Sequence, residues 1–155
     1  MQARLTGIAL AVTLTVLAAG CGGSSQMSKA DYEAKIQADG QAVQAAVATI
    51  SASFSSIKSV AKEVATAEVA AKKAADDLDA LNPPKDIAAD NDTLVKALRA
   101  IDAELKKLAQ AAKDGDQAAA AQAASAIQNS PEIKAGQAAV QDMKKKGYKV
   151  GALGN

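Results

Sequence analysis

The sequence predicts an all-α protein: an antiparallel helical bundle of three to four long helices with a kinked last helix. Alanine, the residue with the highest helix propensity, accounts for 40 of the 155 residues. Between residues 28 and 150 the large apolar residues recur at intervals of three and four, as on one face of a helix. No useful length of that region shows the alternation with period two that is typical of strands.

The first two helices are expected over residues 28–50 and 56–81. Ser28 with Asp31 three residues later resembles a capping box at the start of a helix. The serine-rich segment 51–56 interrupts the apolar register, and because serine competes for backbone hydrogen bonds, a turn is predicted there. The segment lacks Gly and Pro, which leaves one continuous helix of about 54 residues as the alternative, at ~80 Å far longer than usual.

Proline and glycine mark the later helix boundaries. Pro83 and Pro84 end the second helix, and Asp86 is expected to start the third. The sequence Asp114-Gly115-Asp116 predicts a turn, with Asp116 as the N-cap of a fourth helix that begins at Gln117.

The last part of the chain is expected to contain a second helix start. Ser130 followed by Pro131 predicts a kink or a short fifth helix. Three lysines followed by Gly147 are typical of a helix C-terminus, after which Tyr148 and Val150 are expected to fold back on the bundle. Residues 151–155 are expected to be a frayed tail.

Residues 1–20 are expected to be a cleaved export signal. Arg4 precedes an apolar stretch of 13 residues, Leu5–Leu17, which would be only about 20 Å long as a helix and too short to span a bilayer. Small residues then precede Cys21, the only cysteine, and Gly-Gly-Ser-Ser follows it as a flexible tether. The alternative is an ordinary signal peptide whose cleavage leaves a free thiol.

Composition excludes several classes of function. Loss of residues 1–20 removes Arg4, which leaves 17 basic against 17 acidic residues, so no charge excess favours nucleic acid. There is no histidine, and one cysteine permits neither an internal disulfide nor a thiolate zinc site. No nucleophile–base set and no phosphate-binding glycine loop is present. We therefore expect a protein that is not an enzyme and that needs no cofactor.

An acidic hairpin between the second and third helices is the best candidate for a ligand site. Acidic residues at a helix C-terminus are disfavoured by the helix dipole. The three aspartates at the end of the second helix therefore suggest a bound Ca²⁺ or another hard cation held by oxygen ligands. The alternative is a set of solvated surface carboxylates. The six candidate metal ligands are Asp76, Asp77, Asp79, Asp86, Asp90 and Asp92.

Two smaller groups of residues, the C-terminal lysines and the aromatic residues, are also candidates for a specific role. The lysines near the C-terminus either contact anionic lipid or an envelope polymer, or simply cap a helix in solvent; they are Lys144, Lys145, Lys146 and Lys149. The only aromatic residues are Tyr32, Phe54 and Tyr148, and they are expected to be core anchors because two of them lie in the apolar registers.

The segment before Cys21 resembles the lipobox of bacterial lipoproteins, although Ala18 occupies the position where leucine is usual. The resemblance implies that the Cys21 sulfur is linked to diacylglycerol and that signal peptidase II cleaves before it. Three further patches resemble small secreted lipoproteins common in actinobacteria, a family without an assigned activity: Ser28-Lys29-Ala30-Asp31-Tyr32, Leu78-Asp79-Ala80-Leu81-Asn82-Pro83-Pro84 and Met143-Lys144-Lys145-Lys146-Gly147-Tyr148.

Taken together, these features predict a lipoprotein signal peptide at 1–20, a lipidated tether at 21–27 and a helical bundle domain at 28–150. We expect a lipid-anchored, non-catalytic binding or structural module on the extracytoplasmic face of the cell membrane. Its partners would be the membrane and possible envelope proteins or polymers. The alternative function is a cation- or small-ligand-binding lipoprotein that uses the acidic hairpin.

Overall fold

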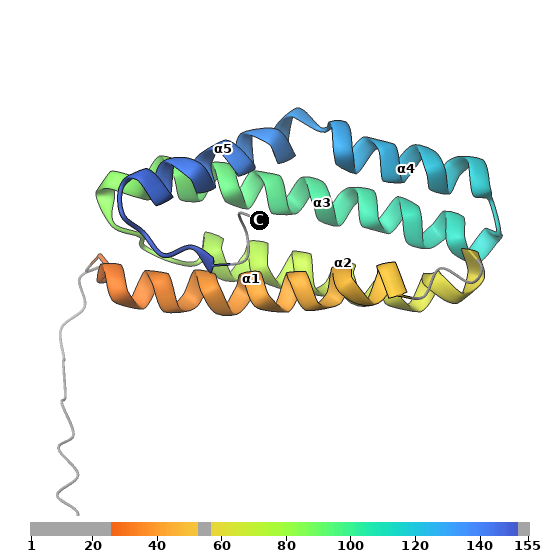
Figure 1. The fold of residues 1–155 in the computed structure, drawn as a ribbon, viewed down its shortest axis with the longest axis horizontal. Coiled ribbons are helices and arrows are strands. Elements are labelled where there is room, and N and C mark those ends of the chain that lie inside the picture. The colour runs from red at the N-terminus through yellow and green to blue at the C-terminus, as the bar shows by residue number, and fades with distance from the viewer. Residues whose placement is uncertain (1–25, 53–56, 152–155) are drawn as a thin grey trace, which may run out of the picture.

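The computed structural model describes residues 26–52 and 57–151. Its order of elements is α1 (Lys29–Ala52), α2 (Ile57–Asp79), the 3-10 helix η1 (Lys85–Ile87), α3 (Ala88–Asp114), α4 (Gln117–Asn129) and α5 (Pro131–Lys145). The fold is all-α, with four helices packed antiparallel and the last of them, formed by α4 and α5, bent by 37° (Figure 1). The predicted class of fold is therefore confirmed.

Helix α3 is the central element of the bundle. It packs against α2, α4 and α5, whereas α1 packs mainly against α2. The four helices run side by side along the long axis, so one end of the bundle holds the starts of α1 and α3 and the ends of α2 and α5 (Figure 1). We call this the hairpin end, because the α2–α3 loop, residues 80–87, lies there.

Capping residues explain most of the helix boundaries. The Ser28 hydroxyl accepts a hydrogen bond from the Asp31 amide at 3.1 Å and donates one to the Asp31 carboxylate at 2.7 Å. The Asp116 side chain accepts from the Ala119 amide at 2.9 Å, and the Ser130 hydroxyl accepts from the Ile133 amide at 3.3 Å. Each of these three predicted caps is present.

Two glycines end helices as the sequence predicts. Gly115 and Gly147 have φ values of 73° and 80°, a left-handed conformation that costs glycine little. After Gly147 the Tyr148 amide donates to the Met143 carbonyl at 2.9 Å, and the Gly147 amide donates to the Lys144 carbonyl at 2.9 Å. This pair of bonds turns the chain back toward the bundle at the end of α5.

Two predicted boundaries need correction. Helix α2 ends at Asp79 rather than near Leu81, because the chain already turns at Ala80. Asp86 does not start the third helix: it lies inside η1, and α3 begins at Ala88 without a side-chain cap. Helices α1 and α2 are separate, as predicted, although α1 continues to Ala52 within the predicted break; Phe54 and the rest of 53–56 lie outside the described residues.

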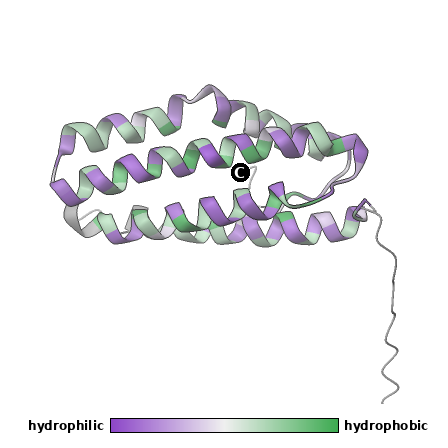
Figure 2. Cartoon of the chain, turned by 180° about the vertical axis from the view of Figure 1, so that it is seen from behind, coloured by the Kyte–Doolittle hydropathy of each residue, from purple (hydrophilic) through white to green (hydrophobic). Residues whose placement is uncertain are grey.

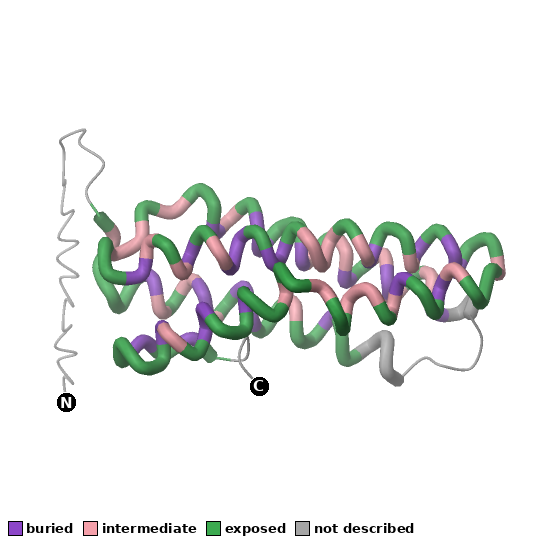
Figure 3. Tube along the Cα trace, turned by 90° about the horizontal axis from the view of Figure 1, so that it is seen from above, coloured by how far each residue is buried: buried purple, intermediate pink, exposed green. Residues whose placement is uncertain are grey.

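The core has two parts that differ in side-chain size. The part at the hairpin end contains tyrosine, leucine, isoleucine and methionine side chains, whereas the part at the opposite end is built largely from alanine and valine. Ile101 of α3 packs against both. Buried segments face the interior along each helix, and hydrophilic residues cover much of the outside (Figures 2 and 3). The larger buried side chains therefore concentrate where both described ends of the chain meet.

Candidate functional site

The described N-terminal residues attach to the α2–α3 loop. The Met27 amide donates a hydrogen bond to the Asn82 carbonyl at 2.9 Å, and the Gln26 side-chain amide donates to the Pro83 carbonyl at 3.2 Å. Both carbonyls lie in the loop that follows α2, outside any helix, so they are available as acceptors. The chain thus enters the fold at the hairpin end. Cys21 and the tether up to Ser25 lie outside the described residues.

The C-terminal residues run along α1 at the same end. The Lys149 amide donates to the Glu33 carboxylate at 3.0 Å, and the Gln37 side-chain amide donates to the Lys149 carbonyl at 2.8 Å. Tyr148 and Val150 are buried in the core, which confirms that both fold back on the bundle. The backbone amide and the backbone carbonyl of Lys149 thus both have hydrogen-bond partners among the side chains of α1.

Two tyrosines form the centre of the hairpin end. The rings of Tyr32 and Tyr148 meet edge to face, with centroids 6.1 Å apart and planes at 89°. The Tyr32 hydroxyl donates to Oδ1 of buried Asn91 at 3.0 Å, and Nδ2 of Asn91 donates to the Leu78 carbonyl at 3.2 Å. Burial, with a smaller effect of the nearby Asp90 charge, raises the pKa of Tyr32 well above its usual range. The prediction of core anchors is confirmed for both tyrosines.

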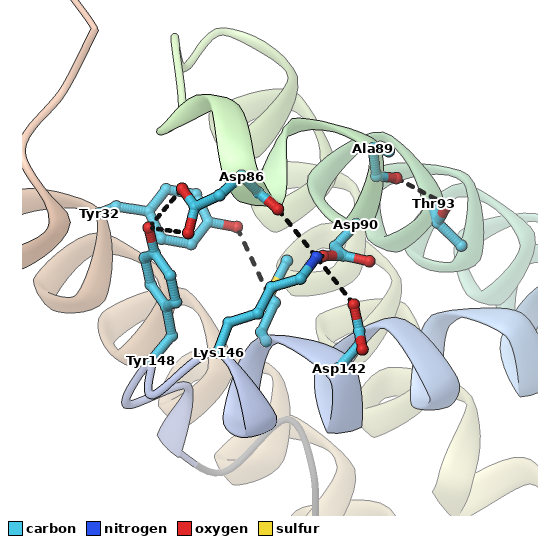
Figure 4. A network of polar contacts seen from close by, with 9 residues as sticks. Tyr32, Asp86, Ala89, Asp90, Thr93, Asp142, Lys146 and Tyr148 are labelled. Atoms are coloured by element: carbon cyan, nitrogen blue, oxygen red, sulfur yellow. Dashed lines mark hydrogen bonds and ion pairs between the residues drawn. The ribbon is translucent and has the colours of Figure 1, made fainter.

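Lys146 ties α5 to the start of α3 (Figure 4). Its Nζ atom donates to the Asp86 carbonyl at 2.8 Å, and it pairs with the carboxylates of Asp90 at 2.7 Å and Asp142 at 2.8 Å. The Tyr148 hydroxyl donates to the Asp86 carboxylate at 2.9 Å. The bonds to Asp142 and Asp90 raise the pKa of Lys146, and the same lysine lowers the pKa of Asp142.

The six predicted metal ligands do not form one cluster. Asp76 pairs with Lys72, Asp77 with both Lys35 and Lys73, and Asp79 with Arg99. Asp86 and Asp90 belong to the network of Tyr148 and Lys146, and Asp92 is exposed. The acids at the end of α2 therefore have basic partners, two of them (Lys35 and Arg99) from other helices, and these partners compensate for the unfavourable position of the acids in the helix dipole.

No three Cys, His, Asp or Glu side chains of residues 26–52 and 57–151 come together as ligands for a metal ion. The structure thus does not supply the shared oxygen cage on which the cation hypothesis depends. Binding of a cation by individual carboxylates of this hairpin stays a prediction, and a titration that tests it is described in the Discussion.

The four predicted contact lysines do not share one role. Lys144, Lys145 and Lys149 have exposed side chains around the end of α5. Lys146 is bound to Asp86, Asp90 and Asp142, so its charge is directed into the protein. Its contact with lipid or polymer stays a prediction, as it does for the other three lysines, and the spacing of the lysines alone does not reveal which of them meets the start of α3.

Asp39 is a buried acid that the sequence analysis did not single out. It is 7% exposed, its Oδ1 atom accepts from Lys35 at 3.2 Å, and its Oδ2 atom has no hydrogen-bond partner. Burial raises the pKa of Asp39, and the bond from Lys35 opposes this shift. Lys35 also bonds Asp77, so one lysine of α1 joins two carboxylates on neighbouring helices. The sequence does contain a signal for the burial of Asp39, because this residue follows Ile36 by three positions and so lies on the apolar face of the first helix.

Comparisons with protein-family models, with curated protein sequences and with solved structures find no match to this chain. The resemblance to actinobacterial lipoproteins therefore stays a prediction that depends on the motifs. None of the described helices has the length and apolar character needed to cross a membrane.

Proposed function

We propose that this chain is a lipid-anchored protein on the extracytoplasmic face of a membrane, where it acts as a non-catalytic binding or structural module. The observation that carries the proposal is the sequence around Cys21: a short apolar stretch, small residues, one cysteine, and then Gly-Gly-Ser-Ser. A thiol is a better nucleophile near neutral pH than a hydroxyl, so it suits attachment of a lipid. Two acyl chains give stable anchoring where one would be marginal.

The attachment of Gln26 and Met27 to the α2–α3 loop supports a defined orientation under this proposal. Gln26 is five positions after Cys21, so the tether extends at most about 18 Å. The hairpin end would then face the membrane. Because α3 has 27 residues and is about 40 Å long, the opposite end would project away from the bilayer and be accessible to envelope partners. The lipid would raise the local concentration of this module at the membrane.

The exposed lysines at the hairpin end support a secondary contact in the same orientation. Near an anionic bilayer, each of Lys144, Lys145 and Lys149 would contribute about 1 kcal/mol of attraction. The test is the binding of the non-acylated protein to vesicles that contain anionic lipid, at low and high salt. Replacing the three lysines with glutamine should abolish any salt-sensitive binding, and Lys107→Gln on α3 is the matched control. Equal binding by the two variants would contradict the contact.

The main test of the anchor is cell fractionation of Cys21→Ser beside the wild type. We expect the wild type in the membrane fraction at the processed length, and the variant unprocessed or released from the lipid-anchored pool. Ser24→Ala keeps the sulfur and serves as the control, which should behave like the wild type. Membrane attachment and identical length in the Cys21→Ser and wild-type proteins would contradict the proposal.

A further inference from the structure

A cleft of about 260 Å³ lies between α1 and α2. Two of its lining residues, Asp39 and Ala74, are buried and form its floor, whereas most of the others are exposed and form its rim. The walls and the rim consist of small or apolar side chains with one threonine and one lysine: Ala42, Thr66, Val69, Ala70 and Lys73. The cleft therefore combines a largely apolar wall with a carboxylate at its base.

The negative charge of Asp39 is only partly compensated by its neighbours. Its Oδ1 atom accepts from Lys35 at 3.2 Å, and its Oδ2 atom has no hydrogen-bond partner in the part of the chain that the structure describes. Lys35 is shared with Asp77, which also pairs with Lys73. Among the described residues, Asp77 thus has two basic partners, whereas Asp39 has a share of one. A buried carboxylate oxygen without a partner is costly, so a donor placed here would stabilise the protein.

The polar groups of the cleft favour a ligand that donates hydrogen bonds and carries positive charge. The Thr66 hydroxyl donates to the Lys62 carbonyl at 3.1 Å, so its oxygen is left as an acceptor. The Lys73 ammonium is directed to Asp77, which compensates its charge. The χ2 torsion of aspartate is soft, so the Asp39 carboxylate can turn toward a ligand. At a share of ~30 Å³ per water molecule in the liquid, the volume of the cleft suits a ligand of several heavy atoms.

We propose that the cleft between α1 and α2 binds a small organic ammonium ion, with its charged nitrogen on Asp39 and its hydrocarbon chain against Val69 and Ala70. The ammonium group donates to Oδ2 of Asp39 and supplies the charge that Lys35 provides only in part. The hydrocarbon chain covers Val69, which is 65% exposed, and so removes apolar surface from water. None of the six aspartates of the acidic hairpin lines this cleft, and the proposal does not depend on the lipid anchor.

NMR titration of the full-length protein with n-butylammonium chloride tests the proposal, and 1-butanol is the uncharged probe of the same length. We expect saturable shifts of the amide signals around Asp39 and Val69, with a dissociation constant on the order of 1 mM for so small a ligand. 1-Butanol should bind at least about tenfold more weakly, because it lacks the charge-assisted hydrogen bond to the carboxylate.

Two variants test the position of the site. Asp39→Asn removes the charge and should weaken the binding of n-butylammonium at least about tenfold. Thr66→Lys adds a positive charge at the exposed rim, leaves Asp39 and the core unchanged, and should also weaken binding. Thr93→Lys is the matched control and should bind like the wild type. Thr93 of α3 makes the same kind of hydroxyl bond, to the Ala89 carbonyl at 2.8 Å, and does not line the cleft.

Three results would overturn the proposal. The first is the absence of saturable shifts with n-butylammonium. The second is binding of 1-butanol as tight as that of n-butylammonium, since the carboxylate would then contribute nothing. The third is an unchanged affinity in either folded variant, because the ammonium ion would then bind somewhere other than this cleft. If Asp39→Asn does not fold, Thr66→Lys decides the question alone.

Discussion

Gly136 of α5 lies against Ala97 of α3 so closely that a Cβ on Gly136 would be 2.4 Å from the Ala97 Cβ. Both residues are buried. The absence of a side chain at Gly136 is thus what allows α3 and α5 to approach here. Glycine inside a helix costs about 1 kcal/mol relative to alanine, so this contact is kept against local helix propensity.

Gly136→Ala should destabilise the protein despite the gain in helix propensity. The clash forces the two helices apart, and overpacking of this kind costs about 1–3 kcal/mol. Urea unfolding measures the change. The swapped variant Gly136→Ala with Ala97→Gly should recover part of the loss, because it moves the methyl group to the other helix. A Gly136→Ala protein as stable as the wild type would contradict this account of the contact.

The buried hydroxyl of Tyr32 should matter more for stability than the hydroxyl of Tyr148. Tyr32→Phe leaves Oδ1 of buried Asn91 without its donor, which costs about 1–3 kcal/mol. Tyr148→Phe leaves the exposed Asp86 carboxylate free to bond water, so the loss should be below about 1 kcal/mol. Urea unfolding of the two variants compares them directly, and the reverse order would contradict the assignment.

Acid should weaken the protein partly through Asp77. The bonds from Lys35 and Lys73 lower the pKa of Asp77 from 3.8 to about 2. A lowered pKa means that the stabilisation is complete above about pH 4 and is lost as the pH falls through 2. Between pH 5 and pH 2 the melting temperature of the wild type should therefore fall more than that of Asp77→Asn.

The exposed residue Asp92 provides a matched control for this experiment. Asp92→Asn should lose stability in acid in parallel with the wild type. If Asp77→Asn also runs parallel to the wild type, the ion pairs of Asp77 do not contribute to the pH dependence.

Calcium at millimolar concentration should leave the melting temperature unchanged. The aspartates near the α2–α3 loop are divided among separate lysine, arginine and tyrosine partners, so a Ca²⁺ ion would have to break several of these bonds to collect enough oxygen ligands. Magnesium serves as the control for a general ionic effect. A rise of several degrees that is specific to Ca²⁺ would instead support the cation-binding alternative.

The sequence predicts the local features of this fold well because their chemistry is local. Ser28, Asp116 and Ser130 cap helices through amides only three residues away, and Gly147 ends α5 by its own backbone freedom. Such signals need no knowledge of what packs against the helix.

The missed features arise from contacts between helices. In the sequence alone, Gly136 indicates only a position of low helix propensity. The reason for a glycine there is the close approach of Ala97 on α3, which the sequence does not reveal. The aspartates of the hairpin were expected to converge because they are near in sequence, but Lys35 and Arg99 pair with two of them from other helices. Asn91 could have been found, since it lies between Ile87 and Leu94 in an apolar register.

The most direct test of the proposed anchor is the mass of the N-terminal peptide of the mature protein, purified from membranes. The account predicts that this peptide begins at Cys21 and is heavier than its amino acids by a diacylglyceryl group. A mature chain that begins at another residue, or one that begins at Cys21 without a lipid, would contradict it.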